Sequence, residues 1–394
     1  MSPMHLARRI DRIEPSITLA LAARARALAA SGRDIVSMAV GEPDFPAPAI
    51  VRETAAERAR SGDVRYTPAA GLPSLRAALA AYLERTRGGA WQAESVTVCH
   101  SAKHALAASI LSIVEDGDEV LIPLPAWASY FDLVRLAGAE PVLVPSPCDA
   151  AGFHPDLDAL SAACTPRTRA ILINSPNNPS GTVWSRGEIE AVANLAAERD
   201  LWLISDEIYR ELCYDGVEAA SPASISPAVR ERTIVIDGAS KAFAMTGYRI
   251  GYLAAPPEFA AAVAKLSSQT NGSPNTIAQV CYERALTEWP PELETMRSAF
   301  SERRTLLLGG LAELGLFTPE PAGAFYAFPE ITPYLGDFAD SGSTGFCEAL
   351  LEAEGLALVP GSAFGTDTHV RLSYATSTEN IEEALGRLAT FLGK

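Results

Sequence analysis

A lysine in small and apolar surroundings is the residue of this chain with the clearest chemical potential. Lys241 follows the β-rich run 233–237, and its neighbours are Gly238, Ala239, Ser240, Phe243 and Met245. An isolated lysine is most often a solvated surface charge. In these surroundings, however, the ammonium is poorly solvated, so the amine can be neutral near pH 7 and condense with an aldehyde.

An acidic residue and a tyrosine follow the strand-like run upstream of this lysine. Residues 201–205 are largely apolar, Asp206 comes directly after them, and Tyr209 follows three residues later. Asp206 could simply cap a helix, because aspartate is a good N-cap residue. Alternatively, it could keep the proton on a pyridine ring, which absorbs carbanion electrons only beside a fixed negative charge. Tyr209 would then donate a hydrogen bond to a ring phenolate oxygen.

Three further side chains suit a flat, anionic ligand. Asn178 lies in the Asn- and Pro-rich turn 174–181, and its amide can both donate and accept hydrogen bonds. Arg371 lies in the alternating run 369–377 without a nearby acid, so a carboxylate is a candidate partner. Trp127 is either a core aromatic residue, which the sequence alone favours, or a plate stacked on a cofactor. The plainer interpretations of Asn178 and Arg371 are an ordinary turn and a surface strand.

A predicted helix begins near residue 101 with a segment suited to a phosphate. Ser101, Ala102 and Lys103 are small enough at their backbones for the first amides of the helix to face a phosphate group. His100 and His104 are four residues apart, a spacing that can bind a metal. No acid or third histidine accompanies them, so a structural or solvent-facing pair is favoured and no metal site is predicted.

The elements that position these residues alternate in type. Between about residues 95 and 255, seven β-rich runs alternate with helix-like stretches, which predicts βαβ units and a largely parallel sheet covered by helices. Long helices are expected over residues 5–32 and about 275–315, and a final helix begins at Thr378. Ligands of open parallel sheets lie beyond the carboxyl ends of the strands, where most of the candidate residues fall.

We therefore expect two domains in one architecture. Residues 45–290 should form a large α/β domain, and residues 1–44 and 291–394 a smaller α+β domain with an N-terminal arm. No internal period indicates a solenoid or propeller.

Composition narrows the possible partners. The chain has 394 residues with a formal net charge of −16, which opposes attraction to nucleic acid or anionic lipid. No apolar stretch is long enough to span a bilayer, and the first residues lack the apolar region of a secretory signal, so a cytoplasmic location is expected. Six cysteines lie far apart without a C-x-x-C pair, which argues against a disulfide framework or a zinc site.

Eight motifs together carry a resemblance to a known family. They are GEPDF (41–45), YTPAAGLPSLR (66–76), SAKHAL (101–106), PAWASY (125–130), NSPNNPSG (174–181), SDEIY (205–209), SKAFAMTGYRIGY (240–252) and RLSYATS (371–377). In this order they resemble the class I aminotransferases of pyridoxal phosphate fold type I, over about residues 10 to 390. The similarity is closest to the bacterial aspartate/aromatic/prephenate subgroup. It implies a large domain with a mostly parallel seven-stranded sheet and a small α+β domain.

The resemblance assigns a role to each candidate residue. Lys241 would form the Schiff base with pyridoxal 5′-phosphate, Asp206 would pair with the pyridine nitrogen, and Tyr209 would contact the ring oxygen. The remaining assignments fall into four groups: Asn178 at the ring oxygen and Trp127 as the stacking plate; Ser101, Ala102, Lys103 and Arg249 around the phosphate; Gly41, Trp127, Asn178 and Arg371 around the substrate α-carboxylate; Lys103 at the distal carboxylate of acidic substrates. Tyr66 would reach the phosphate of a neighbouring subunit, so the resemblance implies a homodimer with shared active sites.

The expected function is transfer of an amino group between an L-amino acid, with aspartate or glutamate favoured, and a 2-oxo acid such as 2-oxoglutarate. The alternatives are an aminotransferase for an aromatic or other specialised amino acid, and a lyase, synthase or oxidase that uses the same cofactor. A cofactor-binding transcriptional regulator would need an N-terminal DNA-binding domain and a basic face, which this sequence lacks.

Two positions depart from the family pattern. Gly238 stands where related enzymes often have a serine, so a phosphate hydrogen bond is either missing or supplied by Ser240. Glu14 stands where members that accept prephenate tend to have a lysine, which argues against that activity.

Overall fold

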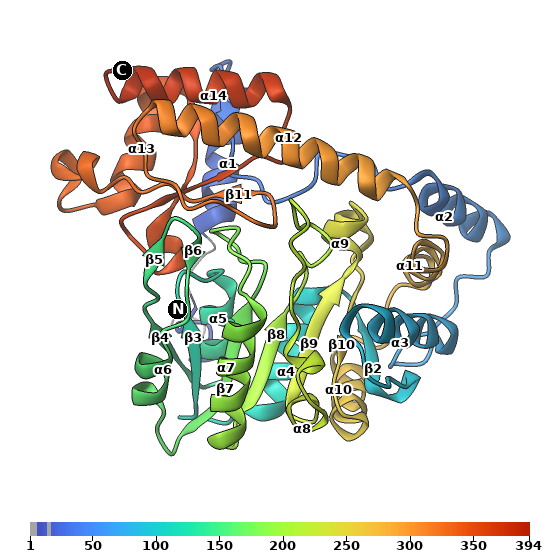
Figure 1. Ribbon diagram of the computed structural model, residues 1–394. Helices are drawn as coiled ribbons and strands as arrows, with labels where there is room; N and C mark the ends of the chain where they lie inside the picture. The colour runs from blue at the N-terminus through green and yellow to red at the C-terminus, as the bar shows by residue number, and fades with distance from the viewer. Residues whose placement is uncertain (1–5, 14–16) are drawn as a thin grey trace, which may run out of the picture.

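The computed structural model describes residues 6–13 and 17–394, and its centre is a seven-stranded sheet (Figure 1). The strand order is β2, β10, β9, β8, β7, β3, β4. The strands are β2 (Val96–Cys99), β3 (Glu119–Pro123), β4 (Glu140–Val144), β7 (Thr168–Asn174), β8 (Trp202–Asp206), β9 (Thr233–Gly238) and β10 (Gly251–Ala254). β10 is antiparallel to both neighbours and every other pair in this sheet is parallel. The predicted α/β architecture with a mostly parallel sheet is therefore confirmed.

Helices cover both faces of the sheet, because successive strand residues point to opposite faces and both sets are apolar. Ile122, Leu172 and Ile204 pack in one core cluster with residues of α4 (Ala102–Ile113), α5 (Ser129–Leu136) and α10 (Pro257–Thr270). The opposite face packs against α6 (Leu157–Ala163), α7 (Arg186–Glu198), α8 (Pro227–Arg230), α2 (Ala49–Ser61), α3 (Pro73–Arg87) and α11 (Thr276–Glu288). The strand ends are thus held from both sides.

A smaller layer lies over the carboxyl ends of the parallel strands (Figure 1). Its helices are α1 (Ile17–Ala30), α12 (Glu292–Glu313), α13 (Gly342–Glu354) and α14 (Thr378–Phe391). Its strands are β1 (Val36–Ser37), β11 (Tyr326–Ala327), β12 (Leu356–Ala357), β13 (Val359–Pro360) and β14 (Val370–Ser373). The pairing of β1 with β12 brings the two ends of the chain together. The hairpin of β5 (Cys148–Asp149) and β6 (Gly152–Phe153) extends toward this layer. The domain boundaries given above stay a prediction.

Two expected helices differ from the structure. The stretch 275–315 is not one helix but two, because α11 ends at Glu288 and α12 begins at Glu292. Trp289 takes a left-handed backbone conformation with φ of 46°, and Pro290 and Pro291 lack the N–H groups that would continue the helix. At the other end, the described part of the expected helix 5–32 is helical only over Ile17–Ala30.

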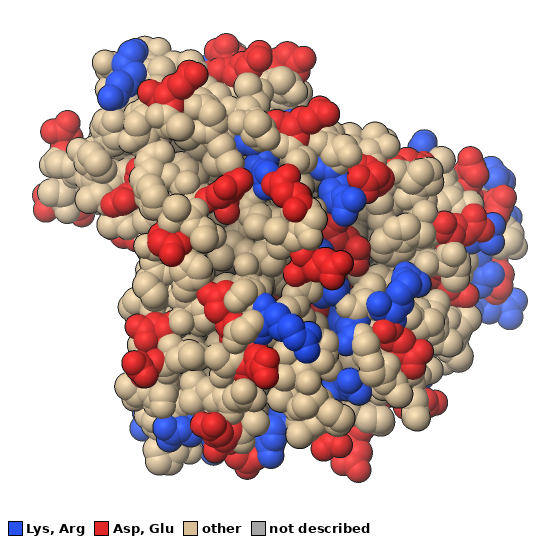
Figure 2. Space-filling view, in the orientation of Figure 1, with Lys and Arg blue, Asp and Glu red and all other residues tan. Residues whose placement is uncertain are grey.

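The described residues also bear on membrane spans, metal clusters, cysteines and surface charge. In residues 6–13 and 17–394, no helix is both long and apolar enough to cross a membrane. The same ranges contain no cluster of three or more histidine, cysteine or acidic residues that could hold a metal ion. All six cysteines are free, and Cys148 is exposed. Figure 2 shows acidic and basic side chains interspersed over one face of the molecule.

Candidate active site

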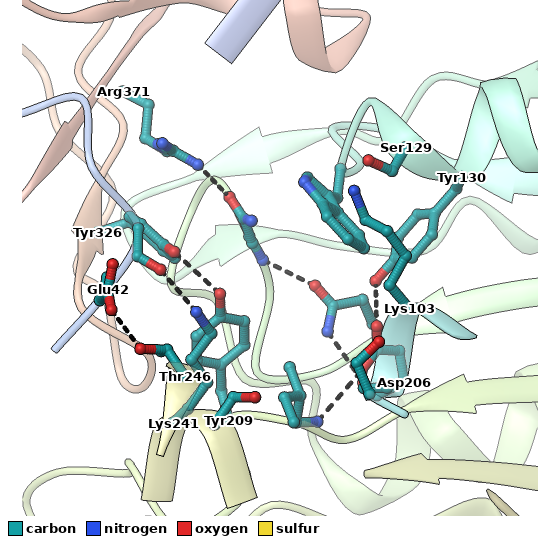
Figure 3. A pocket seen from close by; sticks show the side chains of 18 of the residues that line it. Glu42, Lys103, Ser129, Tyr130, Asp206, Tyr209, Lys241, Thr246, Tyr326 and Arg371 are labelled. Atoms are coloured by element: carbon teal, nitrogen blue, oxygen red, sulfur yellow. Dashed lines mark hydrogen bonds between the residues drawn. The ribbon is translucent and has the colours of Figure 1, made fainter. Parts of the chain in front are cut away.

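A cavity of about 310 Å³ lies at the carboxyl ends of the parallel strands. Figure 3 shows that side chains from both layers point into it, with Arg371 and Tyr326 on one side and Lys103, Tyr130 and Asp206 on the other. Its lining includes every predicted site residue except Tyr66: Gly41, Ser101, Ala102, Lys103, Trp127, Asn178, Asp206, Tyr209, Lys241, Arg249 and Arg371. The fold therefore gathers residues from widely separated motifs.

Lys241 lies on α9 (Ala239–Ala242), a single helical turn directly after β9. Its Nζ donates a hydrogen bond to the carbonyl oxygen of Gly41 at 2.6 Å and lies 5.7 Å from the centre of the Phe325 ring. Burial lowers the pKa of Lys241 to about 8, and Arg371 and Arg249 also lower it, while Glu42 opposes them. With that pKa, Lys241 is an uncharged, nucleophilic amine in about a tenth of the molecules at pH 7.

Asp206 ends β8 and is completely buried. One carboxylate oxygen, Oδ2, accepts a hydrogen bond from the Tyr130 hydroxyl at 2.7 Å, and Oδ1 accepts one from the Ile208 amide at 3.2 Å. Burial raises the pKa of Asp206 to about 7; the two hydrogen bonds lower it, and Asp237 and Glu207 raise it. The carboxylate has no cationic partner within 4.0 Å among the described residues, so a protonated ligand nitrogen would supply the missing charge.

Two tyrosines and a glycine form the wall near Lys241. The hydroxyl groups of Tyr209 and Tyr326 are 2.9 Å apart. A Cβ atom at Gly41 would lie 2.5 Å from the Tyr326 hydroxyl oxygen, so only glycine lets the backbone approach this wall without a shift. Tyr326 lies on β11, and nothing in the sequence showed that its hydroxyl faces Tyr209.

Arg371 lies on β14 and is completely buried. Nη1 donates to Asn178 Oδ1 and Nη2 to the carbonyl oxygen of Ala39, each at 2.8 Å. Nε has no hydrogen-bond partner in the described part of the chain. The guanidinium also lies 4.4 Å from the centre of the Tyr326 ring. Both bonded partners are neutral, so the buried positive charge can still take a carboxylate. The surface-strand interpretation of Arg371 is wrong.

The N-terminus of α4 forms a cradle beside these groups. Ser101 is the N-cap, and its Oγ accepts a hydrogen bond from the His104 amide at 3.1 Å. The amides of Ala102 and Lys103 precede the first intrahelical hydrogen bonds, so they are free to bind an anion. Arg249 lines the same cavity and is close enough to Lys103 to lower the pKa of that lysine. The predicted phosphate segment therefore has suitable geometry.

Gly238 is explained by packing. It pairs with Gly251 across β9 and β10, and a Cβ atom at Gly238 would lie 2.8 Å from the Gly251 Cα atom. A serine at this position would force a shift of the backbone. Ser240, by contrast, lines the cavity and carries a hydroxyl group. This arrangement supports Ser240 as the alternative donor.

Trp127 and Lys103 lie together at the mouth of the cavity. The Trp127 ring packs edge-on against Tyr130, with ring centres 5.4 Å apart, and is only partly buried. Lys103 Nζ is 4.6 Å from the centre of the Trp127 ring. Burial lowers the pKa of Lys103, Arg249 lowers it further, and Asp132 raises it. Trp127 therefore lines the cavity and also packs, partly buried, against the main core cluster, so both interpretations of this residue stay open.

One predicted site residue lies outside the cavity. Tyr66 is 98% exposed and does not line the cavity of its own chain. Glu14 lies outside the described residues. The rings of His100 and His104 are 5.7 Å apart and form the expected pair.

Sequence reasoning missed Tyr130, Asn174, Tyr326, Glu42 and Thr246, which also line the cavity. Asn174 connects two strand ends, because its Nδ2 donates to the Asp206 carbonyl at 2.9 Å and its Oδ1 accepts from the Asn178 amide at 2.8 Å. Tyr130 lies in PAWASY and Asn174 in NSPNNPSG, so the motifs held a signal for both.

Comparison with known proteins gives a consistent result. Residues 33–388 match the family "Aminotransferase class I and II". The aspartate/prephenate aminotransferase of Thermus thermophilus is 44% identical over 392 residues, covering 99% of each chain. The aspartate aminotransferase of Bacillus subtilis is 38% identical, covering 99% of this chain and all of the relative.

A solved structure of Thermus thermophilus aspartate aminotransferase with maleate superimposes with a TM-score of 0.93 and 42% identity, over 98% of this chain and 100% of that chain. Both the sequence match and the fold therefore extend over nearly the whole chain. The protein belongs to the class I and II aminotransferase family and is an aminotransferase.

Proposed function

We propose that this aminotransferase uses pyridoxal 5′-phosphate and transfers an amino group between an L-amino acid, with aspartate and glutamate favoured, and a 2-oxo acid such as 2-oxoglutarate. One observation carries the proposal: a single cavity holds a lysine with a lowered pKa, a buried carboxylate and a buried arginine, and within residues 6–13 and 17–394 the carboxylate has no cationic partner and the arginine no acidic one. The relatives named aspartate aminotransferase support the choice of acidic substrates.

The residues present fit this cofactor at three points. The amides at the start of α4, with Ser101 and Arg249, would hold the phosphate. Trp127 would stack on the ring, Asp206 would pair with its nitrogen, and Tyr209 and Asn178 would bond the ring oxygen. Lys241 would bond the aldehyde carbon. The strongest structural support is Asp206, a fully buried carboxylate that lacks a cation among the described residues.

The chain's own residues would do most of the positioning. Bound pyridoxal phosphate supplies a ring that withdraws electrons from the substrate α-carbon. Arg371 and Asn178 would hold the α-carboxylate, which brings the α-carbon toward Lys241. The Lys241 amine would take the α-proton as a general base and return a proton in the second half-reaction. Asp206 would keep the proton on the ring nitrogen throughout.

The direct test is a comparison of two lysine variants. In Lys241→Ala, the pH-dependent absorbance of the bound cofactor and the conversion of aspartate and 2-oxoglutarate to oxaloacetate and glutamate should both be lost. Lys265→Ala on the exposed face of α10 should retain both, because Lys265 does not line the cavity. Normal turnover by Lys241→Ala would contradict the proposal. If the wild type binds the cofactor but forms no glutamate from any of the twenty amino acids, a lyase, synthase or oxidase would replace it.

We also propose a homodimer whose active sites are shared. The observation that supports it is Tyr66, a large side chain that is 98% exposed although its motif belongs to the family's site. Mixing inactive Lys241→Ala with a Tyr66→Ala variant, after partial unfolding and refolding, should restore activity above either variant alone. A fully active monomer in sedimentation would contradict this arrangement.

A further inference from the structure

A second group of charged side chains lies behind the strand ends that carry Asp206 and Lys241. Arg87 ends α3, and its side chain is completely buried. Its Nε lies 2.8 Å from Glu207 Oε2, and its Nη2 lies 2.7 Å from Asp237 Oδ2. Because Glu207 follows β8 and Asp237 belongs to β9, this one guanidinium connects two neighbouring strand ends.

The two acids would repel each other without the arginine. The last pair of β8 and β9 is Asp206 with Ile236, and the Glu207 amide still donates to the Ile236 carbonyl at 2.8 Å, so Glu207 comes beside Asp237 just beyond the end of β8. Side chains alternate between the two faces of a sheet, so both acids point away from the Asp206 side, toward α3. Like charges directly opposite each other destabilise a sheet, and burial strengthens the repulsion.

The other groups around the acids are neutral hydrogen-bond donors. Glu207 Oε1 accepts hydrogen bonds from Ser205 Oγ at 3.1 Å and Ser221 Oγ at 2.5 Å. Asp237 Oδ2 accepts one from the Tyr252 hydroxyl of β10 at 3.2 Å. None of these donors carries a positive charge, so they do not replace the arginine.

Tyrosines and one further acid complete the surroundings. Tyr82 lies five residues before Arg87 on α3, with its ring centre 5.2 Å from the Arg87 guanidinium, and its hydroxyl donates to Glu211. Tyr282 of α11 packs on Tyr252. Burial raises the pKa values of Tyr82, Tyr252 and Tyr282 well above the usual value, so all three stay neutral. Glu211 and Asp206 are further acids nearby, and the Arg85 guanidinium lies 5.5 Å from the centre of the Tyr82 ring. Among the described residues, however, only Arg87 places a cation within 4.0 Å of Glu207 or Asp237.

We propose that Arg87 is a positioning residue: by holding Glu207 and Asp237 together it fixes the ends of β8 and β9, and with them the relative placement of Asp206 and Lys241. Arg87 does not line the cavity and touches no reacting atom. Its influence passes through short connections. Glu207 is the residue after Asp206, and the Gly238 amide donates to Asp237 Oδ1 at 2.7 Å, three residues before Lys241.

The test compares three variants of the full chain. Arg87→Met removes the charge and keeps similar volume. The triple variant Arg87→Met/Glu207→Gln/Asp237→Asn removes the arginine and both acids, which leaves a neutral cluster. Arg304→Met is the matched control, because Arg304 is also buried but its partners Asp215 and Glu320 have exposed side chains. Arg87→Lys keeps the charge and serves where Arg87→Met fails to fold.

Two quantities are measured. The first is the melting temperature of the cofactor-free protein between pH 6 and pH 9. The second is the dissociation constant of pyridoxal phosphate at pH 6 and pH 8.5, from quenching of tryptophan fluorescence. The inference rests on the proposed function only for the second quantity. If the wild type fails to bind the cofactor, the proposed function fails, and the melting curves still test Arg87.

The expected results depend on pH. Even beside Arg87, burial raises the pKa of Asp237 to about 6, so without Arg87 this acid should stay protonated to higher pH. The melting temperature of Arg87→Met should therefore fall below that of the wild type by an amount that grows from pH 6 to pH 9. Its cofactor affinity should fall at least tenfold at pH 8.5 and less than threefold at pH 6. The triple variant should recover both, and Arg87→Lys should lie between Arg87→Met and the wild type.

Three results would overturn the proposal. The first is a loss in Arg87→Met that is the same at every pH, which would mean that Arg87 only fills space. The second is a triple variant no better than Arg87→Met. The third is an Arg304→Met control with the same growing loss of stability and affinity.

Discussion

Two arginines of this molecule are completely buried and have opposite surroundings. Arg87, behind the sheet, lies within 2.8 Å of two carboxylates. Arg371, in the cavity, bonds only an amide oxygen and a backbone carbonyl, and its Nε has no partner in the described chain. A buried charge is costly unless it is paired. Arg87 is paired within the fold, whereas Arg371 has no acidic partner among the described residues, as the proposed binding of a substrate carboxylate requires.

The same contrast separates the two groups of buried acids. Glu207 and Asp237 share the Arg87 guanidinium, while Asp206, on the opposite face of the same strand ends, has only neutral donors. In the described part of the chain, neither Arg371 nor Asp206 has a partner of opposite charge within 4.0 Å, and the fold holds the two groups on different sides of the cavity (Figure 3). A ligand with a protonated ring nitrogen at one end and a carboxylate at the other would pair with both Asp206 and Arg371. Because each charge is costly without such a ligand, replacing either residue by a neutral one should stabilise the ligand-free protein and lower its activity.

The largest expected effect is on Arg371. In Arg371→Leu, kcat/KM for aspartate and glutamate should fall by a factor of a few hundred to a few thousand, which corresponds to a loss of about 3–5 kcal/mol in transition-state stabilisation. The reason is that a buried charge-assisted pair with the substrate is lost. The melting temperature should stay the same or rise, whereas that of Arg87→Met should fall. Arg371→Lys should recover only part of the activity, since lysine lacks the planar fork of donors. Steady-state kinetics and thermal melts check this, and a drop in kcat/KM below tenfold would contradict it.

The second prediction concerns Asp206 in the cofactor-free protein. The pKa of Asp206 is raised to about 7 by burial, so between about pH 4 and pH 7 the folded chain keeps a proton that the unfolded chain has released. The contribution of Asp206 to stability therefore falls as pH rises through this window. Asp206→Asn should raise the free energy of unfolding at pH 8 by roughly 2–4 kcal/mol, and by less at pH 5.

Urea unfolding at the two pH values measures this gain, and activity should nearly vanish in the same variant. Asp158→Asn on the exposed face of α6 is the control. Its free energy of unfolding should not show the larger gain at pH 8 than at pH 5 that is expected for Asp206→Asn. If Asp206→Asn lowers stability at pH 8, Asp206 is not an unpaired buried charge, and the contrast with Glu207 and Asp237 fails.

The sequence predicted the cavity, with Arg371 and Asp206, better than it predicted the charged cluster around Arg87. All seven strands of the main sheet were visible as β-rich runs, and the cavity residues followed because ligands bind at the carboxyl ends of parallel strands. Arg87 was not predicted, since it lies 150 positions before Asp237 and only the strand register places Glu207 beside that acid. Short-range patterns carry no information about such a register.

Of the other differences, one has a local cause and two arise from the packing of the layers. Trp289 and two prolines divide the expected helix 275–315, although the apolar pattern continues across them. The side of Trp127 that faces the cavity and the hydroxyl contact of Tyr326 with Tyr209 depend on how the two layers meet. The sequence places such residues on an element, but the packing of the layers decides which face is open.

The third prediction concerns Lys103, a cation that is neither fully buried nor fully exposed. Its Nζ lies over the Trp127 ring at 4.6 Å, at the mouth of the cavity. If it pairs with the distal carboxylate of acidic substrates, Lys103→Ser should lower kcat/KM for aspartate and glutamate by roughly 1.5–3 kcal/mol and spare neutral amino acids. Half-reaction rates with aspartate and alanine measure the difference. Equal losses for both would assign Lys103 to the cofactor phosphate instead.

The smallest effect is expected for an arginine whose carboxylate partner is exposed. Arg297 Nη2 lies 2.5 Å from Glu294 Oε2 on α12, closer than either contact of Arg87, but the two side chains are 46% and 64% exposed. Water already solvates both charges, so Arg297→Gln should change the free energy of unfolding by less than about 0.5 kcal/mol. Urea unfolding of Arg297→Gln beside Arg87→Met at pH 8 makes the comparison direct. A cost of 2 kcal/mol or more at Arg297 would mean that the nitrogen–oxygen distance governs these pairs. A small cost at Arg297, with a large one at Arg87, would show that burial of the charges governs these pairs. The same argument underlies the proposed pairing of Arg371 with a substrate carboxylate.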